Sequence, residues 1–143
     1  MPTRAFAPYP SSVPDVRRYV TETLVHAPAD LCQTAALLVS ELATNAIRHA
    51  DGLDFEVTVR RLPDTGRVWV GISDAGGGYP ARRSPRVTDE HGRGLQLVSS
   101  LADRWGVRRN RDTDTKTVWF ELAGPALSPE PVPATDLAAL PPT

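Results

Sequence analysis

The first half of the chain repeats its hydrophobic residues with a helical period. Val16, Val20 and Leu24 recur at every fourth position, behind a capping serine and with Pro14 in the first turn. This pattern predicts a helix over residues 12–27, which Pro28 closes. A second helix is predicted over 30–50, because one apolar stripe runs along it, made of Leu31, Ala35, Leu38, Leu42 and Ala46.

The pattern changes to strict alternation after Gly52, which is typical of strands with one face exposed to water. Residues 53–60 alternate Leu53, Phe55, Val57 and Val59 with polar side chains, and 67–73 alternate again after a turn. These runs predict an antiparallel hairpin. A second hairpin is predicted from 105–109 and 116–122. Between the hairpins we expect a loop over 75–91 and a helix that ends at Gly106, with apolar positions Leu95, Val98, Leu101 and Ala102.

The order of these elements predicts an α+β fold, a two-layer α/β sandwich with helices packed on one face of a mixed, largely antiparallel sheet. We expect residues 12–123 to form one domain. Residues 1–11 form an N-terminal arm, with an edge strand as one alternative. Residues 124–143 contain six prolines and no periodic apolar pattern, so a disordered tail is expected.

Composition narrows the function classes. A formal net charge of -1 gives no electrostatic reason for binding along a nucleic acid. The single cysteine, Cys32, excludes an internal disulfide, suits a reducing cytoplasm and is expected to serve packing. No apolar run approaches the roughly 20 residues that span a bilayer. We therefore expect a cytoplasmic protein without direct contact to nucleic acid or membrane.

Polar side chains recur on one face of the second predicted helix. Glu41, Asn45 and His49 are spaced by four residues, so they stack beside Leu38 and Leu42 at the border of the core. A carboxylate and an amide at such a border need partners, which a ligand can supply. A solvated polar face is the alternative for this helix taken alone.

Two glycine-rich segments add candidate ligand contacts. Asp74 ends a predicted strand and precedes Gly76, Gly77 and Gly78; its carboxylate only accepts hydrogen bonds, as an adenine amino group requires. In the segment HGRGL, residues 91–95, two glycines precede a helix whose amino terminus attracts anions. Each segment alone is equally explained by an ordinary turn or a helix cap. Neither a Walker nor a dinucleotide-binding pattern is present.

Together, ELATNAIRHA (41–50), DAGGG (74–78), HGRGL (91–95) and KTVWFEL (116–122) resemble the Bergerat-type ATPase (GHKL) superfamily of gyrase, Hsp90, histidine kinases and MutL. The phrases SELATNAIRHA, LADRWGV and KTVWFEL are similar to the stand-alone anti-sigma-factor and serine/threonine switch-kinase branch. The likeness covers residues 12–122. It implies ATP bound with Mg2+ between the helices and a lid, here 79–91.

The resemblance also implies individual roles. Asn45 would be the magnesium ligand, Glu41 the general base and Asp74 the adenine-binding residue. The other ATP contacts that it implies are Arg48, His49, Gly76, Gly78, Gly92, Arg93, Gly94, Leu95 and Thr117. The family often has a glycine-rich turn before the KT pair, where this chain has RDTDT (111–115).

The function expected from these motifs is an ATP-dependent serine/threonine kinase that phosphorylates an antagonist protein and sequesters a sigma factor. The alternative is a non-catalytic module in which ATP gates a protein-binding surface. The catalytic half of a histidine kinase is less well supported, because 143 residues leave no room for a dimerisation helix pair. Relatives commonly form dimers, so a homodimer is a further expectation.

Overall fold

The computed structural model describes residues 3–49, 52–74 and 96–124. The elements with defined bounds are β1 (Thr3–Phe6), α1 (Ser12–Thr23), α2 (Ala29–His49), β2 (Phe55–Arg61), β3 (Val68–Asp74), β4 (Arg104–Asn110) and β5 (Thr115–Leu122). Residues 96–101 are also helical. The predicted order of helices and hairpins is therefore confirmed.

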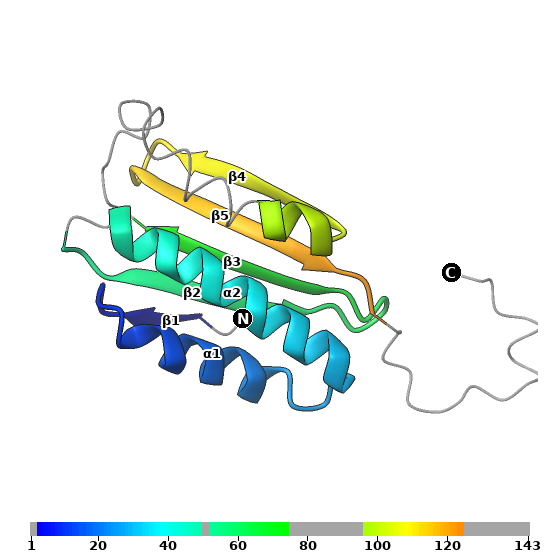
Figure 1. The fold of residues 1–143 in the computed structure, drawn as a ribbon. Coiled ribbons are helices and arrows are strands. Elements are labelled where there is room, and N and C mark those ends of the chain that lie inside the picture. Colours follow the sequence, from blue (N-terminus) through cyan, green and yellow to red (C-terminus); the bar gives the residue numbers. More distant parts are fainter. Residues whose placement is uncertain (1–2, 50–51, 75–95, 125–143) are drawn as a thin grey trace, which may run out of the picture.

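The strands form one sheet in the order β1-β2-β3-β5-β4. All four pairings are antiparallel, so the part of the expectation that called the sheet mixed is wrong for the described strands. Figure 1 shows α1 and α2 side by side on one face of this sheet, with α2 over β3 and α1 toward β1 and β2. The two-layer α+β fold is thus confirmed.

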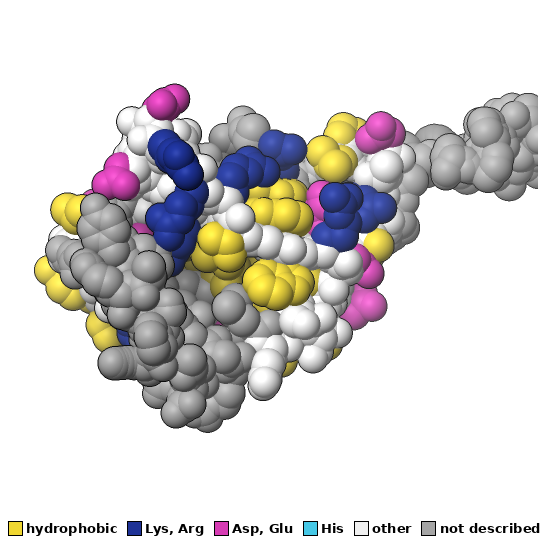
Figure 2. Space-filling view, turned by 90° about the horizontal axis from the view of Figure 1, so that it is seen from above, with side chains coloured by type: hydrophobic (Ala, Val, Ile, Leu, Met, Phe, Trp, Pro, Cys, Tyr) yellow, Lys and Arg dark blue, Asp and Glu magenta, His cyan; other side chains and the backbone are white. Residues whose placement is uncertain are grey.

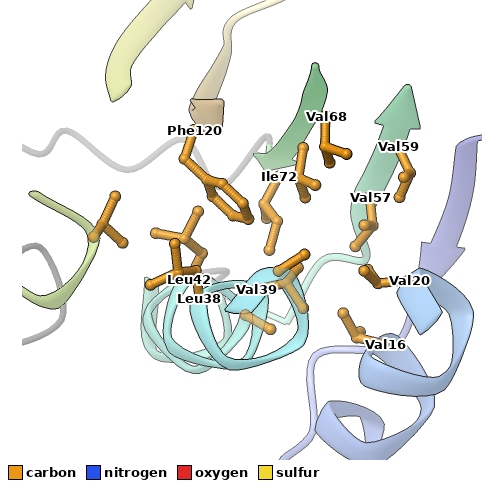
Figure 3. Close-up of a cluster of buried hydrophobic side chains, with 14 of the residues drawn as sticks. Val16, Val20, Leu38, Val39, Leu42, Val57, Val59, Val68, Ile72 and Phe120 are labelled. Atoms are coloured by element: carbon orange, nitrogen blue, oxygen red, sulfur yellow. The ribbon is translucent and has the colours of Figure 1, made fainter. Parts of the chain in front are cut away.

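The core lies between the two layers. Val16 and Val20 of α1 face Val57 and Val59 of β2, as Figure 3 shows. The stripe of α2 packs on β3 and β5 through fully or nearly fully buried side chains, among them Leu38, Val39, Leu42, Val70, Ile72 and Phe120. At about 1.5 to 3 kcal/mol for each large side chain, this burial is the main force that holds α2 on the sheet.

Several expected boundaries differ from the observed ones. α1 ends at Thr23, and the amide of Leu24 closes its last turn on the carbonyl of Val20. The predicted serine cap is wrong: Ser11 makes no capping hydrogen bond with its side chain, and the Ser12 hydroxyl donates to the Ala7 carbonyl at 2.7 Å.

The positions of Leu53, Leu101 and Gly106 also differ from the prediction. Leu53 is 50% exposed because it precedes β2, and Leu101 is exposed although Val98 on the same helical segment is fully buried. Gly106 does not end a helix but lies inside β4. A Cβ at Gly106 would come within 2.9 Å of the Trp119 ring, so a close cross-strand contact explains this glycine.

The N-terminal strand β1 forms one edge of the sheet. It pairs with β2, where Phe6 lies opposite Phe55, and the two rings stack at 5.9 Å between centroids. The guanidinium of Arg4 lies 5.8 Å from the centre of the Tyr19 ring. Burial raises the pKa of the Tyr19 phenol, while Arg4 acts in the opposite direction. The phenol therefore remains protonated at neutral pH.

The other edge is β4, and it is exposed. Figure 2, which views the molecule from the side of β4, shows hydrophobic side chains with lysine and arginine side chains around them. Trp105 and Val107 are among the exposed apolar residues, and the strand also carries Arg104, Arg108 and Arg109. Charged residues on an outermost strand oppose pairing with another sheet.

Candidate functional site

The polar face of α2 borders the core, as the helical spacing predicts. Glu41 and Asn45 are both half-buried, and they lie next to the buried residues Leu42 and Ala46. His49 is half-buried in the next turn, whereas Arg48 is exposed. The helix therefore presents a carboxylate and an amide on one face, one turn apart and at its boundary with the second layer.

A hydrogen bond from α1 reaches α2 just before this face. The guanidinium of Arg17 on α1 donates to the Ser40 hydroxyl at 3.0 Å. Ser40 in turn donates to the Ala36 carbonyl at 2.8 Å, and Thr44 donates to the Ser40 carbonyl at 2.8 Å. The bond from Arg17 joins α1 to α2 at the residue before Glu41, and the other two lie within α2. Glu41 is thus carried by a helix that is tied to its neighbour one residue away, as a positioned acid or base requires.

At the end of β3, Asp74 lies on the face of the sheet that is turned toward the helix layer. Asp74 shares its face with Val70 and Ile72 because side chains alternate along a strand, and this face packs against α2. Its exposed fraction is only 8%. A carboxylate this deeply placed beside an apolar core must be hydrogen-bonded to be stable, so its surroundings favour a defined set of donors.

The register of β5 sets the face of the sheet on which Thr117 lies. Asp74 pairs with Lys116, whereas Thr117 pairs with Ser73, and the two hydroxyls share a hydrogen bond of 2.6 Å. Residues that pair directly have their side chains on the same face, and neighbouring residues alternate. Thr117 therefore lies on the face opposite to Asp74 and α2.

Lys116, which is not among the predicted ATP contacts, lies beside Asp74 in the sheet. The register puts it opposite Asp74, on the helix-covered face and next to Arg109 of β4. Phe120 and Leu122 are buried, and counting back from them in steps of two reaches Lys116. The alternation within KTVWFEL therefore contained the signal for this position.

The remaining predicted contacts lie outside the described residues. These are Gly76, Gly78, Gly92, Arg93, Gly94 and Leu95, together with the expected lid over 79–91. Among the described residues, α2 packs against β3, whose last residue is Asp74. The contacts outside the described residues remain predictions.

The candidate site consists of residues from two elements. Glu41 and Asn45 on α2 are half-buried, and Asp74 at the end of β3 is buried. A sequence model of the family described as histidine kinase-like ATPase domain matches residues 6–122, which include both elements. The chain belongs to this family. Comparison with curated proteins finds no match.

As a histidine kinase-like ATPase domain, the protein is an ATP-binding regulatory domain of the GHKL superfamily. The carboxylate of Asp74 and the amide of Asn45 are groups that suit ATP and magnesium. The Asp74 carboxylate only accepts hydrogen bonds and lies at the sheet, where it can accept from an adenine amino group. Asn45 offers an amide oxygen, a hard ligand that suits Mg2+.

The site of this ATPase domain does not resemble an all-protein metal centre. Within the parts of the chain that the structure describes, no three His, Cys, Asp or Glu side chains gather as metal ligands. Magnesium in nucleotide sites needs only one or two protein ligands, because phosphates and water complete its shell. Nor does any helix of the described parts combine the length and apolarity needed to cross a membrane.

Proposed function

We propose that this domain is a cytoplasmic anti-sigma factor that uses MgATP to phosphorylate a serine or threonine of an antagonist protein. The observation that carries the kinase half is the place of Glu41, half-buried one turn before Asn45 on the rigid helix α2. Similarity of SELATNAIRHA, LADRWGV and KTVWFEL to the switch-kinase branch supports the sigma-factor half. A homodimer is part of this proposal.

Each residue has a distinct task in this proposal. Asp74 would accept a hydrogen bond from the base, and the Asn45 amide oxygen would hold a magnesium ion. The nucleotide is the substrate that supplies the phosphoryl group, and the magnesium ion, when bound, would supply charge neutralisation there. Glu41 accepts the proton of the substrate hydroxyl, and the oxygen of that hydroxyl bonds to the γ-phosphorus. The bond between the γ-phosphorus and the oxygen that bridges it to the β-phosphate breaks at the same time, so that ADP leaves.

Phosphate transfer from labelled ATP tests the role of Glu41. Wild-type protein and Glu41→Gln are incubated with candidate antagonist proteins encoded in the same genome. We expect Glu41→Gln to bind ATP like the wild type and to transfer phosphate about 100 to 10,000 times more slowly, the usual range for loss of a general base. The control is Glu22→Gln, because Glu22 is an exposed carboxylate on α1.

The outcomes separate the two candidate functions. If wild type and Glu41→Gln bind ATP equally and transfer phosphate at the same rate, Glu41 is not the base. If the wild type binds ATP and no antagonist receives phosphate, the kinase proposal fails in favour of a module that ATP gates without chemistry.

A further inference from the structure

The face of the sheet turned away from α1 and α2, here called the outer face, has a pair of tryptophans at its centre. Trp69 of β3 and Trp119 of β5 stack with their centroids 6.2 Å apart and their planes 19° from parallel. Both rings are half-buried. Neither α1 nor α2 covers this face, because both pack on the other side of the sheet (Figure 1).

Two glycines let these rings lie close to the strands. A Cβ at Gly71 would come within 2.5 Å of the Trp69 ring, and one at Gly106 within 2.9 Å of the Trp119 ring. Each indole therefore occupies the space that a side chain would take at the neighbouring outer-face position. The result is a broad aromatic surface, a kind that binds proline-rich segments in extended conformation.

Positive charge surrounds this aromatic pair. The guanidinium of Arg60 lies 5.3 Å from the centre of the Trp69 ring. The register puts Arg104 and Arg108 of β4 on the same face. Glu121 is the nearest acidic neighbour, and its carboxylate already lies 3.5 Å from Arg104 and 3.8 Å from Arg67. Glu56 of β2 also lies on this face, opposite Ser73, so arginines still outnumber carboxylates around the rings and the surface favours an acidic ligand.

The chain's own C-terminal segment has the complementary sequence. Residues 125–143 contain Glu130 and Asp136 and no lysine or arginine. Three prolines alternate with other residues at 129, 131 and 133, which favours an extended polyproline conformation. A segment with this composition has no core of its own, but it can become ordered on a surface that binds it.

The segment that joins β5 to these prolines is long enough for an intramolecular contact. Trp119 lies five residues before Gly124, about 17 Å along an extended chain. The seven residues from Gly124 to Pro131 span about 22 Å in polyproline conformation. The segment can therefore fold back along β5 and place its prolines over the two indoles. We propose that residues 129–136 dock in extended conformation over Trp69 and Trp119 on the outer face.

The three tryptophans of the chain report on the two faces of the sheet separately. Trp69 and Trp119 lie on the outer face, whereas Trp105 pairs with Phe120 and so lies on the face toward the helices. The indole N–H signals of the full chain are recorded by NMR and compared with those of the variant Pro129→Ser/Pro131→Ser/Pro133→Ser. We expect the signals of Trp69 and Trp119 to shift and that of Trp105 to remain in place. Equal positions for all signals in the two proteins would overturn the proposal.

A charge reversal at adjacent positions adds a matched control. Arg108 lies on the outer face and Arg109 on the opposite one, and both are exposed. In an Arg108→Glu background the shift caused by the proline substitutions should shrink, whereas an Arg109→Glu background should preserve it. Equal effects of the two reversals would contradict docking over the outer face. A shift that vanishes on dilution would assign the contact to a second molecule and overturn the intramolecular proposal.

Discussion

At the scale of single residues, the register of β3 and β5 separates side chains that are neighbours in sequence. Asp74 and Lys116 lie on the face that packs against the helices, whereas Ser73 and Thr117 lie on the outer face. The two pairs are adjacent along the strands and still have different surroundings. A ligand held between α2 and the sheet would therefore contact Asp74 directly, and Thr117 only through the backbone of β5 or through Ser73.

The variants Asp74→Asn and Thr117→Val distinguish these positions. We expect Asp74→Asn to weaken ATP binding about tenfold, because a hydrogen bond to a charged acceptor is about twice as strong as a neutral one. Thr117→Val should leave ATP affinity unchanged and lower the free energy of unfolding by about 1 kcal/mol, through loss of the bond to Ser73. Calorimetric titration and urea denaturation measure the two quantities. A loss of affinity in Thr117→Val equal to that in Asp74→Asn would contradict the assignment of faces.

The sequence predicts Asp74 and Asn45 as candidates because glycine-rich and helical patterns are local in sequence. The face on which Thr117 lies follows instead from its phase relative to the buried positions of its strand. Phe120 is fully buried and sets that phase, so the alternation was readable from KTVWFEL. Partners across the sheet, such as Ser73 for Thr117, depend on register and could not be read from either strand alone.

At the scale of elements, α2 has two roles on one surface. Its apolar stripe holds it on β3 and β5, and its polar face places Glu41 and Asn45 at the border of that contact. Any loosening of the stripe therefore also displaces the candidate site. Two adjacent leucines mark the boundary between the buried and the exposed face of α2: Leu38 is fully buried, whereas Leu37 is 45% exposed.

These two leucines give a matched pair for stability. We expect Leu38→Ala to lower the free energy of unfolding by about 2 to 5 kcal/mol, because it leaves a cavity between α2 and the sheet. Leu37→Ala should change it by no more than about 0.5 kcal/mol, as is usual for exposed positions. Urea denaturation at constant temperature measures both. Comparable losses in the two variants would mean that α2 faces the sheet differently.

Periodicity predicted the existence and type of the elements, since buried residues repeat at the period of each element. Contacts across the fold decided details that periodicity did not. Gly106 has the sequence appearance of a helix stop, yet the Trp119 ring across the strands requires a glycine there. Asp114 in the β4–β5 turn has φ at 58°, a left-handed conformation that aspartate tolerates better than most residues. The turn therefore forms without a glycine at this position.

At the scale of the whole molecule, the candidate site joins the two layers. Asn45 belongs to the helix layer and Asp74 to the sheet, so a nucleotide that contacts both adds a connection between them. A ligand that binds only the folded state stabilises it by mass action. The metal should contribute through Asn45, and its contribution can be separated from that of the nucleotide by chelation.

Thermal unfolding with MgATP and with ATP plus EDTA makes that separation. At a ligand concentration of one hundred times Kd, stabilisation is about 2.7 kcal/mol, which for a chain of this size raises Tm by about 10 °C. The wild type should show a larger rise with MgATP than with ATP plus EDTA, because Asn45 binds nucleotide through the metal. Asn45→Ala should remove that difference, whatever its own Tm without ligand.

The control is Asn110→Ala, in which the lost side chain accepts hydrogen bonds from Asp112 and Thr113 in the β4–β5 turn. This control should unfold at lower temperature and keep the full difference between the two ligand conditions. If Asn45→Ala keeps it too, the metal is held elsewhere and the division of labour between Asn45 and Asp74 is wrong.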